Sequence, residues 1–363
     1  MWLMIFGISI LAGIAGAIYM VGKIGKISIF ANMDNRLVAR ILCLIIVILV
    51  AAILCMIFDV TNTIVIIMHV AVFLLAGDLI GFILRKCHVP VSGRIIDLAA
   101  VLLCVIYFVI GWILMHGLWE TDYALTTDKN VGSLRIAHIA DSHVGTGFSG
   151  KGFAKQLEKI QAADPDILVI TGDCVDDSTG RQDMLDACEA LKNFRTKYGI
   201  YYCLGNHDMG YYSNGKRGYS GEEMLQCLRD SGVNVLLDES VLIDDRFYVI
   251  GRRDADYGRS DRMSAEDIIK DLDKEKYMIV LDHQPTDYDA EAAAGMDLVL
   301  SGHTHGGQLW PLEYIQPLIS KNDNVRGYER RGGTDFIVTD GISDWAILFR
   351  TGCRSEYNII DIK

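Results

Sequence analysis

Four long apolar runs fill the first third of the chain, and they constrain its fold more than any other feature. Each run is close to the ~20 residues that an α-helix needs to cross the hydrocarbon core of a bilayer. The runs extend over Trp2 to Val21, Leu37 to Phe58, Thr63 to Leu84 and Ile95 to Trp119. We therefore predict an all-α transmembrane region of four helices over residues 1–119. A cleaved signal peptide is the alternative for the first run, but no basic segment precedes it and no clear small-residue cleavage site follows it.

Basic residues in the connecting loops predict the orientation of these helices. Lys23, Lys26 and Arg36 follow the first run, and Arg85, Lys86 and Arg94 lie before the fourth. The second loop, Asp59 to Asn62, contains no basic residue. Because cytoplasmic loops are enriched in Lys and Arg, we expect the first and third loops in the cytoplasm. The chain is then a multi-pass protein of the cell membrane whose polar part faces away from the cytoplasm.

Two ionisable residues, His69 and Asp78, lie inside the third apolar run, where such side chains are costly and often functional. Nine positions separate them, which is about 900° around a helix and places them on opposite faces. We expect them to take part in helix packing or to face water. A substrate or ion path is the alternative.

The rest of the chain is acidic. Residues 1–119 hold seven Lys and Arg and four Asp and Glu, so the other 244 residues carry 27 basic and 42 acidic side chains, a net charge of -15. A surface of this charge repels the phosphates of a nucleic acid duplex, which we exclude as a partner. Bound divalent metals would reverse the potential locally, so a small phosphorylated substrate is compatible with it. We predict a linker over residues 120–132 and one domain over residues 133–363.

Five cysteines lie in this polar part, an odd number, and most of them fall in apolar strand or helix patterns. We expect buried reduced thiols rather than a disulfide framework.

Short apolar strands alternate with amphipathic helices from Ser133 onward. The predicted strands cover Leu134 to Ala140, Asp166 to Thr171, Ile200 to Leu204, Met278 to Leu281 and Leu298 to Leu300. A polar motif follows each of them directly. The carboxyl ends of strands are where α/β sheets usually place ligand sites, so the five motifs are expected to meet.

The motifs combine carboxylates with imidazoles. They are D-S-H at Asp141 to His143, G-D at Gly172 and Asp173, G-N-H-D at Gly205 to Asp208, His283 alone, and G-H-T-H at Gly302 to His305. Divalent ions such as Mn, Fe or Zn accept carboxylate oxygen and imidazole nitrogen together. Asp173 follows a glycine turn and is suited to bridge two ions. Each motif alone is more often structural, but five in order predict a two-metal centre for phosphoryl chemistry. His138 belongs to no motif and is interpreted as a core or surface histidine.

This set of motifs resembles the calcineurin-like metallophosphoesterase family, whose pattern is D-x-H, G-D, G-N-H-D/E, H and G-H-x-H in this order. The resemblance covers roughly residues 134–310. Its continuation through Gln308 is similar to a branch of membrane-associated bacterial phosphodiesterases. It implies an α/β fold in which two packed β-sheets are flanked by helices, a four-layer α/β/β/α arrangement.

The resemblance also implies roles for individual residues. The first of two divalent metal ions would be bound by Asp141, His143, Asp173 and His305, and the second by Asp173, Asn206, His283 and His303. His207 would protonate the leaving oxygen or stabilise the phosphoryl group, and Asp208 is placed to orient it.

The activity implied is that of a membrane-anchored phosphohydrolase in which a metal-bound hydroxide attacks a phosphodiester or pyrophosphate bond. A lipid- or nucleotide-sugar-linked substrate fits best, because four spans exceed what a simple anchor requires. One alternative is a phosphatase for proteins or small monoesters. Another is a non-catalytic metal-binding sensor module, against which the intact His207 and complete ligand set argue.

Two departures from the branch pattern concern the surroundings of the centre. Thr339 to Ser343 stands where relatives have an S-R-G-like turn, so Asp340 would add negative charge if it faces the site. Pro311 to Gly333 is long and basic, and we expect a solvated loop, with a lid that meets substrate phosphate or a lipid headgroup as the alternative. Arg252 to Asp254 raises the same alternatives. Met209 to Ser220 is expected to form a mobile rim.

Overall fold

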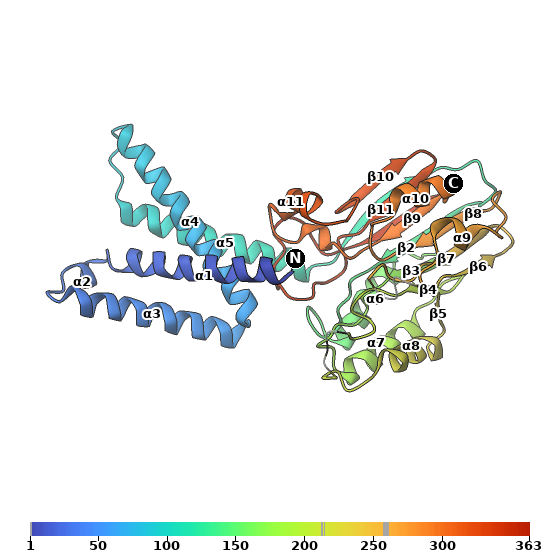
Figure 1. Cartoon of the computed structure of the whole chain (residues 1–363), viewed down its shortest axis with the longest axis horizontal. Coiled ribbons are helices and arrows are strands. Elements are labelled where there is room, and N and C mark those ends of the chain that lie inside the picture. The colour runs from blue at the N-terminus through green and yellow to red at the C-terminus, as the bar shows by residue number, and fades with distance from the viewer. Residues whose placement is uncertain (1, 212, 214, 257–260) are drawn as a thin grey trace. The chain divides into compact units, whose positions relative to one another are not determined.

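The computed structural model describes residues 2–211, 213, 215–256 and 261–363. The chain divides into two compact units (Figure 1). The helical unit comprises Met1–Gly111 with Ala346–Leu348, and the α/β unit comprises Trp112–Trp345 with Phe349–Lys363.

The helical unit is built from apolar helices. They are α1 (Trp2–Ile24), α2 (Ser28–Ala31), α3 (Arg36–Ile57), α4 (Val60–Lys86) and α5 (Gly93–His116). All except α2 are long and apolar enough to cross a membrane, and most of their described side chains are exposed. Lipid tails solvate such a surface, and the helices satisfy their own backbone hydrogen bonds. The four long apolar helices predicted for this part of the chain are confirmed.

His69 and Asp78, the two ionisable residues of the third apolar run, make contacts with neighbouring helices. The Asp78 carboxylate accepts hydrogen bonds from Tyr19 Oη at 2.5 Å and from Lys23 Nζ at 2.7 Å, both on α1. The His69 ring packs against the Phe108 ring of α5, with centroids 5.3 Å apart. These contacts agree with the helix-packing role expected for both residues.

The α/β unit contains two six-stranded sheets. The first has the order β1 (Trp119–Leu125), β12 (Glu356–Ile362), β2 (Leu134–Ile139), β3 (Ile167–Thr171), β4 (Ile200–Cys203) and β5 (Val233–Val235). Strands β2 to β5 are parallel, and β12 pairs antiparallel with β2 and parallel with β1. The central strands are continuous apolar runs such as I-L-V-I-T in β3, as is typical of parallel strands buried on both faces.

The second sheet also has a parallel centre, but its antiparallel strands are at the two edges. Its order is β10 (Gly327–Arg331), β11 (Thr334–Val338), β9 (Leu298–Ser301), β8 (Tyr277–Leu281), β7 (Phe247–Gly251) and β6 (Glu239–Ile243). The four inner strands are parallel, and the two edge strands are antiparallel to their neighbours.

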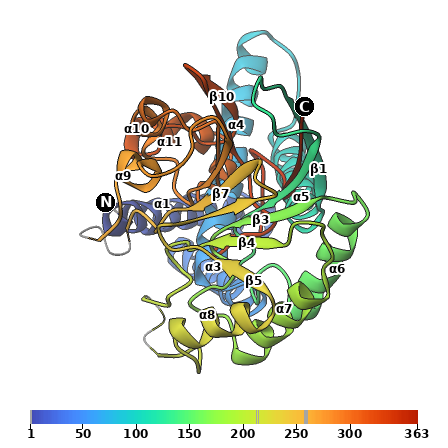
Figure 2. The same cartoon turned by 90° about the vertical axis from the view of Figure 1, so that its right-hand side faces the viewer.

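Three layers of apolar side chains hold the unit together. One lies between the two sheets and includes Ile136, Val169, Phe247 and Ile279. The second joins the outer face of the first sheet to α6 (Gly150–Gln161), α7 (Arg181–Asn193) and α8 (Gly221–Asp230). The third joins the second sheet to α9 (Ala265–Ile269) and α10 (Tyr288–Ala294). Figure 2 shows these two groups of helices on opposite sides of the strands, which confirms the predicted four-layer arrangement.

Two polar segments predicted to be irregular are regular elements. The linker predicted over residues 120–132 is wrong over its first part, because residues 119–125 form β1 and pair with β12 from Trp119↔Glu356 to Leu125↔Ile362. Its sequence W-E-T-D-Y-A-L is polar because β1 is an edge strand with alternate residues exposed. The loop predicted over Pro311 to Gly333 contains α11 (Leu312–Ile319) and β10, so that prediction is wrong as well.

Candidate metal centre

The predicted motifs of both sheets meet at one place, beyond the carboxyl ends of their strands. The Asp141 backbone N–H, after β2, donates to the carbonyl of Gly172, after β3, at 3.1 Å. The His303 backbone N–H, after β9, donates to Asp141 Oδ2 at 2.9 Å and so ties the second sheet to the first. The prediction from strand order that these segments converge is confirmed.

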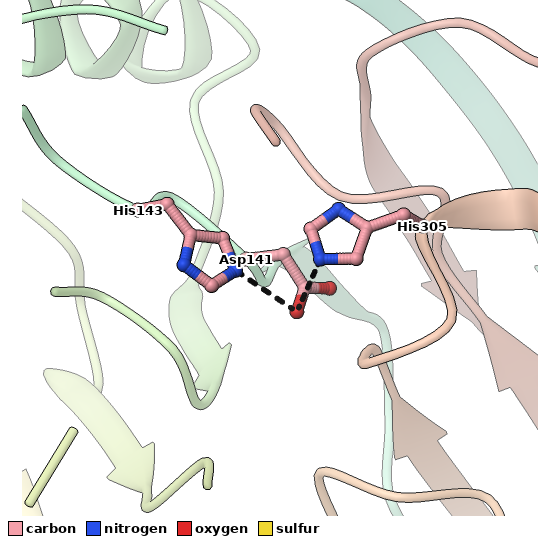
Figure 3. Close-up of side chains that lie close together, drawn as sticks. All are labelled: Asp141, His143 and His305. Carbon is pink, nitrogen blue, oxygen red and sulfur yellow. Dashed lines mark ion pairs between the residues drawn. The ribbon is translucent and has the colours of Figure 1, made fainter. Parts of the chain in front are cut away.

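One group of donors consists of Asp141, His143 and His305, all buried (Figure 3). Asp141 Oδ1 lies 4.0 Å from His143 Nε2 and 3.8 Å from His305 Nε2. These separations are too long for hydrogen bonds, and His143 Nε2 has no hydrogen-bond partner among the described residues. Two atoms that each bond one cation at about 2.0–2.2 Å can lie up to ~4 Å apart, so this donor set fits a divalent ion.

A second group surrounds Asp173 and Asn206. His283 Nε2 lies 3.2 Å from Asp173 Oδ2 and 3.1 Å from Asn206 Oδ1, which is also 2.9 Å from His303 Nδ1. The same Asp173 Oδ2 lies 3.7 Å from His143 Nε2 of the first group. The carboxylate of Asp173 therefore stands between the two groups, in the position of a bridging ligand.

Buried partners on the far side of three rings set their orientation. The Nδ1 atoms lie 2.8 Å from the Thr171 carbonyl for His283, 2.9 Å from Asp344 Oδ1 for His305 and 3.2 Å from Asp176 Oδ2 for His143. For His283 and His305, a partner that accepts the Nδ1 proton leaves Nε2 unprotonated for a metal ion, whereas His143 and Asp176 lie within ion-pair distance without the geometry of a hydrogen bond. Sequence reasoning missed Asp176 and Asp344, and the only sequence signal was the acidic run that continues the G-D motif.

Backbone conformation distinguishes the centre from the rest of the domain. Five of the seven predicted ligands have positive φ: Asp141 (53°), His143 (37°), Asp173 (53°), His303 (70°) and His305 (49°). This region is uncommon for residues other than glycine, and such residues cluster at functional sites. A Cβ on Gly205 would lie 2.1 Å from Asp173 Oδ1, so only glycine lets that carboxylate reach its position.

The electrostatics of the second group suit a cation. Burial would raise the pKa of Asp173, but the neighbouring His283 ring holds it well below its usual range. Burial lowers the pKa of His283, yet the charge of Asp173 raises it well above the ordinary value. A metal ion would replace that proton and satisfy the same carboxylate. Burial lowers the pKa of His303 to about 3, which keeps its ring neutral, as a ligand requires.

His207 is fixed at the edge of the centre. Its backbone N–H donates to Asp173 Oδ1 at 2.9 Å, and its Nδ1 lies 2.7 Å from Asp177 Oδ2. The side chain keeps 14% of its surface exposed. Burial lowers the pKa of His207, but the hydrogen bond to Asp177 and the charges of Asp173 and Asp176 raise it to about 9. These carboxylates favour the protonated ring, which can donate a proton.

Asp208 has a different role from the predicted one. Its buried carboxylate accepts backbone hydrogen bonds from Gly205 at 2.7 Å, Asp173 at 3.0 Å and Cys174 at 3.0 Å. The prediction that Asp208 orients His207 is wrong, and Asp177 makes that contact. Adjacency in sequence did not reveal that the Asp208 side chain turns back onto the G-D turn and fixes its shape.

His138 and Asp340 lie outside the donor groups. His138 is fully buried, with Nε2 at 2.9 Å from Thr171 Oγ1, and burial lowers its pKa to about 3, so it is a neutral core histidine. Asp340 is also buried and lies 2.8 Å from Arg326 Nη2, and burial raises the pKa of its carboxyl to about 7.

Two other segments noted in the sequence contain buried arginines. Arg252 pairs with Asp282 at 3.0 Å and with Glu291 at 2.8 Å, a structural ion cluster. Within the predicted rim Met209 to Ser220, Arg217 donates to the Asp208 carbonyl at 2.9 Å, whereas positions 212 and 214 lie outside the described residues.

Arg350 supports the metal centre through Asp344, and its replacement is expected to destabilise the protein. It is fully buried, and its Nε donates to Asp344 Oδ2 at 2.7 Å, while Asp344 holds His305. We expect Arg350→Met to lower the free energy of unfolding by about 3–5 kcal/mol, because it removes the arginine partner of the buried Asp344 carboxylate and leaves His305 as its neighbour.

Denaturant unfolding followed by tryptophan fluorescence measures this change, with Arg181→Met as the control. Arg181 pairs with Glu223 on the surface, where both side chains are more than half exposed, so its loss costs about 1 kcal/mol or less. Equal destabilisation by the two variants would contradict the supporting role of Arg350.

Comparison with known proteins agrees with this geometry. The family model for calcineurin-like phosphoesterases matches residues 134–307. A protein of Aquifex aeolicus called an uncharacterized metallophosphoesterase is 33% identical over 249 residues, covering 66% of this chain and 90% of that protein. The chain belongs to the calcineurin-like metallophosphoesterase family. The resemblance predicted from the motifs is confirmed.

Further relatives of this metallophosphoesterase extend beyond the matched region. A Campylobacter jejuni metallophosphoesterase is 31% identical, over 63% of this chain and 59% of that protein. A Danio rerio protein called a transmembrane protein with metallophosphoesterase domain is 28% identical, over 65% of this chain and 54% of that protein. The chain spans about three fifths of the length of the first curated relatives it matches.

Proposed function

We propose that this metallophosphoesterase is a membrane-anchored hydrolase of phosphodiester or pyrophosphate bonds that depends on two divalent metal ions. The observation that carries the proposal is the position of Asp173, whose Oδ2 lies 3.7 Å from His143 of one donor group and 3.2 Å from His283 of the other. Mn, Fe and Zn all match these oxygen and nitrogen donors. When bound, the two ions supply positive charge for the phosphoryl oxygens and a water nucleophile near neutral pH.

The chain's own residues position the acid. Asp173 Oδ1 accepts a hydrogen bond from the backbone N–H of His207. Asp173, which lies between the two donor groups, therefore also fixes the position of His207 beside them. Asp177 holds Nδ1 and favours the charged ring. His207 then gives a proton to the departing oxygen of the ester.

The helical unit favours a diester or pyrophosphate over a monoester. A phosphate that joins a lipid to its headgroup, or a nucleotide to a sugar, is linked on both sides. Because the chain has four helices suited to a bilayer, a lipid- or nucleotide-sugar-linked phosphate is the favoured class of substrate.

Hydrolysis assays on the full chain in detergent with Mn test the proposal. We expect kcat/KM to be at least about tenfold higher for bis-p-nitrophenyl phosphate or a nucleotide sugar than for p-nitrophenyl phosphate. Preference for the monoester would support the phosphatase alternative. Activity on none of them with Mn, Fe or Zn would support the sensor alternative.

The loop charges of the helical unit support an extracytoplasmic α/β unit, which is part of the proposal. A reporter fused after Lys363 that is active only outside the cytoplasm is expected to show activity. Activity of the complementary cytoplasmic reporter would overturn this orientation.

Replacement of Asp177 by Asn is expected to move the alkaline limb of the pH profile. His207 must be protonated to act as an acid, so kcat falls as the pH rises through its pKa. The hydrogen bond to Asp177 raises that pKa, so Asp177→Asn shifts the limb to lower pH by about one unit. Profiles of kcat against pH measure the shift, with the exposed Asp230→Asn as control. An unchanged limb would contradict the pairing of Asp177 with the catalytic acid.

A further inference from the structure

Helix α11 presents apolar side chains to solvent close to the metal centre. None of its eight residues, all of them described, is buried. Tyr314 is 66% exposed, Leu318 83% and Ile319 48%, and Trp310 just before the helix is 60% exposed. A surface helix of a water-soluble domain usually turns its apolar side chains toward the core, whereas α11 turns them toward solvent.

Contacts on the opposite side of α11 keep its apolar side chains turned toward solvent. A Cβ on Gly307, in the last metal motif, would lie 2.6 Å from Glu313 Cα, so the first turn of α11 packs tightly on that loop. Arg326 Nη1 lies 3.4 Å from Glu313 Oε2, and its Nη2 pairs with the buried Asp340. The inner side is therefore held by backbone and charged groups, and the apolar side has nowhere to pack within the domain.

We propose that α11 is an interfacial helix that docks onto the surface of a phospholipid bilayer. Trp and Tyr beside aliphatic residues are typical of segments that lie at the membrane–water interface. The exposed Lys321, two residues after the helix, adds a cation for anionic headgroups. The chain also carries four helices suited to span a bilayer, which keeps the membrane at a high effective concentration around α11.

Docking would bring lipid phosphates to the metal centre. Helix α11 packs against the 3-10 turn His305–Gly307, which contains a predicted ligand. Headgroups at the docked surface would then lie beside the two donor groups. This consequence rests on the proposed function, whereas docking itself does not.

Quenching of Trp310 by lipid tests docking without any assay of activity. The full chain is placed in nanodiscs made with acyl-brominated or unbrominated phosphatidylcholine and phosphatidylglycerol, and the fluorescence of Trp310→Phe is subtracted from that of the unaltered protein. We expect the Trp310 signal to fall at least about twofold in the brominated lipid. Equal signals in the two lipids would overturn the proposal. If Trp310 is then also shielded from iodide, a second copy or another protein covers the helix instead.

A charge on α11 tests the consequence for substrates. We expect Leu318→Asp to raise KM about tenfold for a phosphodiester lipid embedded in vesicles, and to leave kcat/KM for soluble bis-p-nitrophenyl phosphate unchanged. The control is Leu185→Asp on α7, where Leu185 is 39% exposed, and it should change neither value. Equal effects of the two variants on vesicle substrate would contradict the role of α11. If no protein, including the unaltered one, hydrolyses soluble bis-p-nitrophenyl phosphate, the result counts against the proposed function. The quenching of Trp310 would still decide whether α11 docks onto the bilayer.

Discussion

His207→Gln lowers kcat for diester hydrolysis by about 10²–10⁴-fold while the protein keeps both metal ions, if His207 is the general acid. The geometry separates these two effects. His207 is held by Asp173 through its backbone N–H and by Asp177 through Nδ1, and its ring lies with Asp176 and Asp177 rather than in either donor group. Gln keeps the backbone contact but cannot carry the proton. The measurement is kcat together with metal content, compared with His116→Gln on α5 as a control outside the centre.

The contribution of proton transfer from His207 depends on the leaving group. A p-nitrophenolate leaves readily without a proton, whereas an alkoxide does not. We therefore expect the loss in His207→Gln to be at least about tenfold larger for a dialkyl-type ester than for bis-p-nitrophenyl phosphate. Equal losses would mean that His207 stabilises the phosphoryl group instead. A loss below about tenfold with both substrates would remove His207 from the mechanism.

Asp173→Asn is expected to remove both metal ions, and with them about 10⁴-fold or more of the activity. Asp173 Oδ2 lies within 3.7 Å of a histidine from each donor group, and the side chain is buried. An amide in its place has almost the same shape but cannot bridge two cations as an anion. The retained shape limits any effect on folding.

The matched variant is His303→Ala, which affects one donor group only. His303 Nδ1 lies 2.9 Å from Asn206 Oδ1 in the second donor group. His303 is not a member of the first group, which consists of Asp141, His143 and His305. Metal analysis after dialysis is expected to find about one ion per chain in His303→Ala and well below one in Asp173→Asn. The same metal content in both variants would contradict a shared carboxylate.

Much of the fold could be predicted because the informative strands are buried. Segments such as Ile167–Thr171 are continuous apolar runs, and each is followed by residues that bind metals in other proteins. The order of those motifs along the chain predicts that Asp141, Asp173 and His303 lie close together. Elements at the edge of the domain are harder to predict from the sequence. Strand β1 has the polar composition of a linker, and α11 contains a proline and exposes its apolar residues.

The residues that support the centre could not be predicted, because their contacts join distant parts of the chain. Asp177 reaches His207 across 30 positions, and Asp344 reaches His305 across 39. Asp208 was assigned to the neighbouring ring on sequence adjacency alone, and its side chain instead accepts the backbone of the G-D turn. Ligand types follow from chemistry, but the direction of a side chain follows from the packed fold.

Titration of Mn into the chelator-stripped full chain tests the central claim most directly. Hydrolysis of bis-p-nitrophenyl phosphate is followed as the ion is added in sub-stoichiometric steps. Two donor groups with the Asp173 carboxylate between them predict a rate that continues to rise until two equivalents per chain are bound and then stays constant. A plateau at one equivalent, or hydrolysis that persists without any added ion, would contradict a two-metal centre.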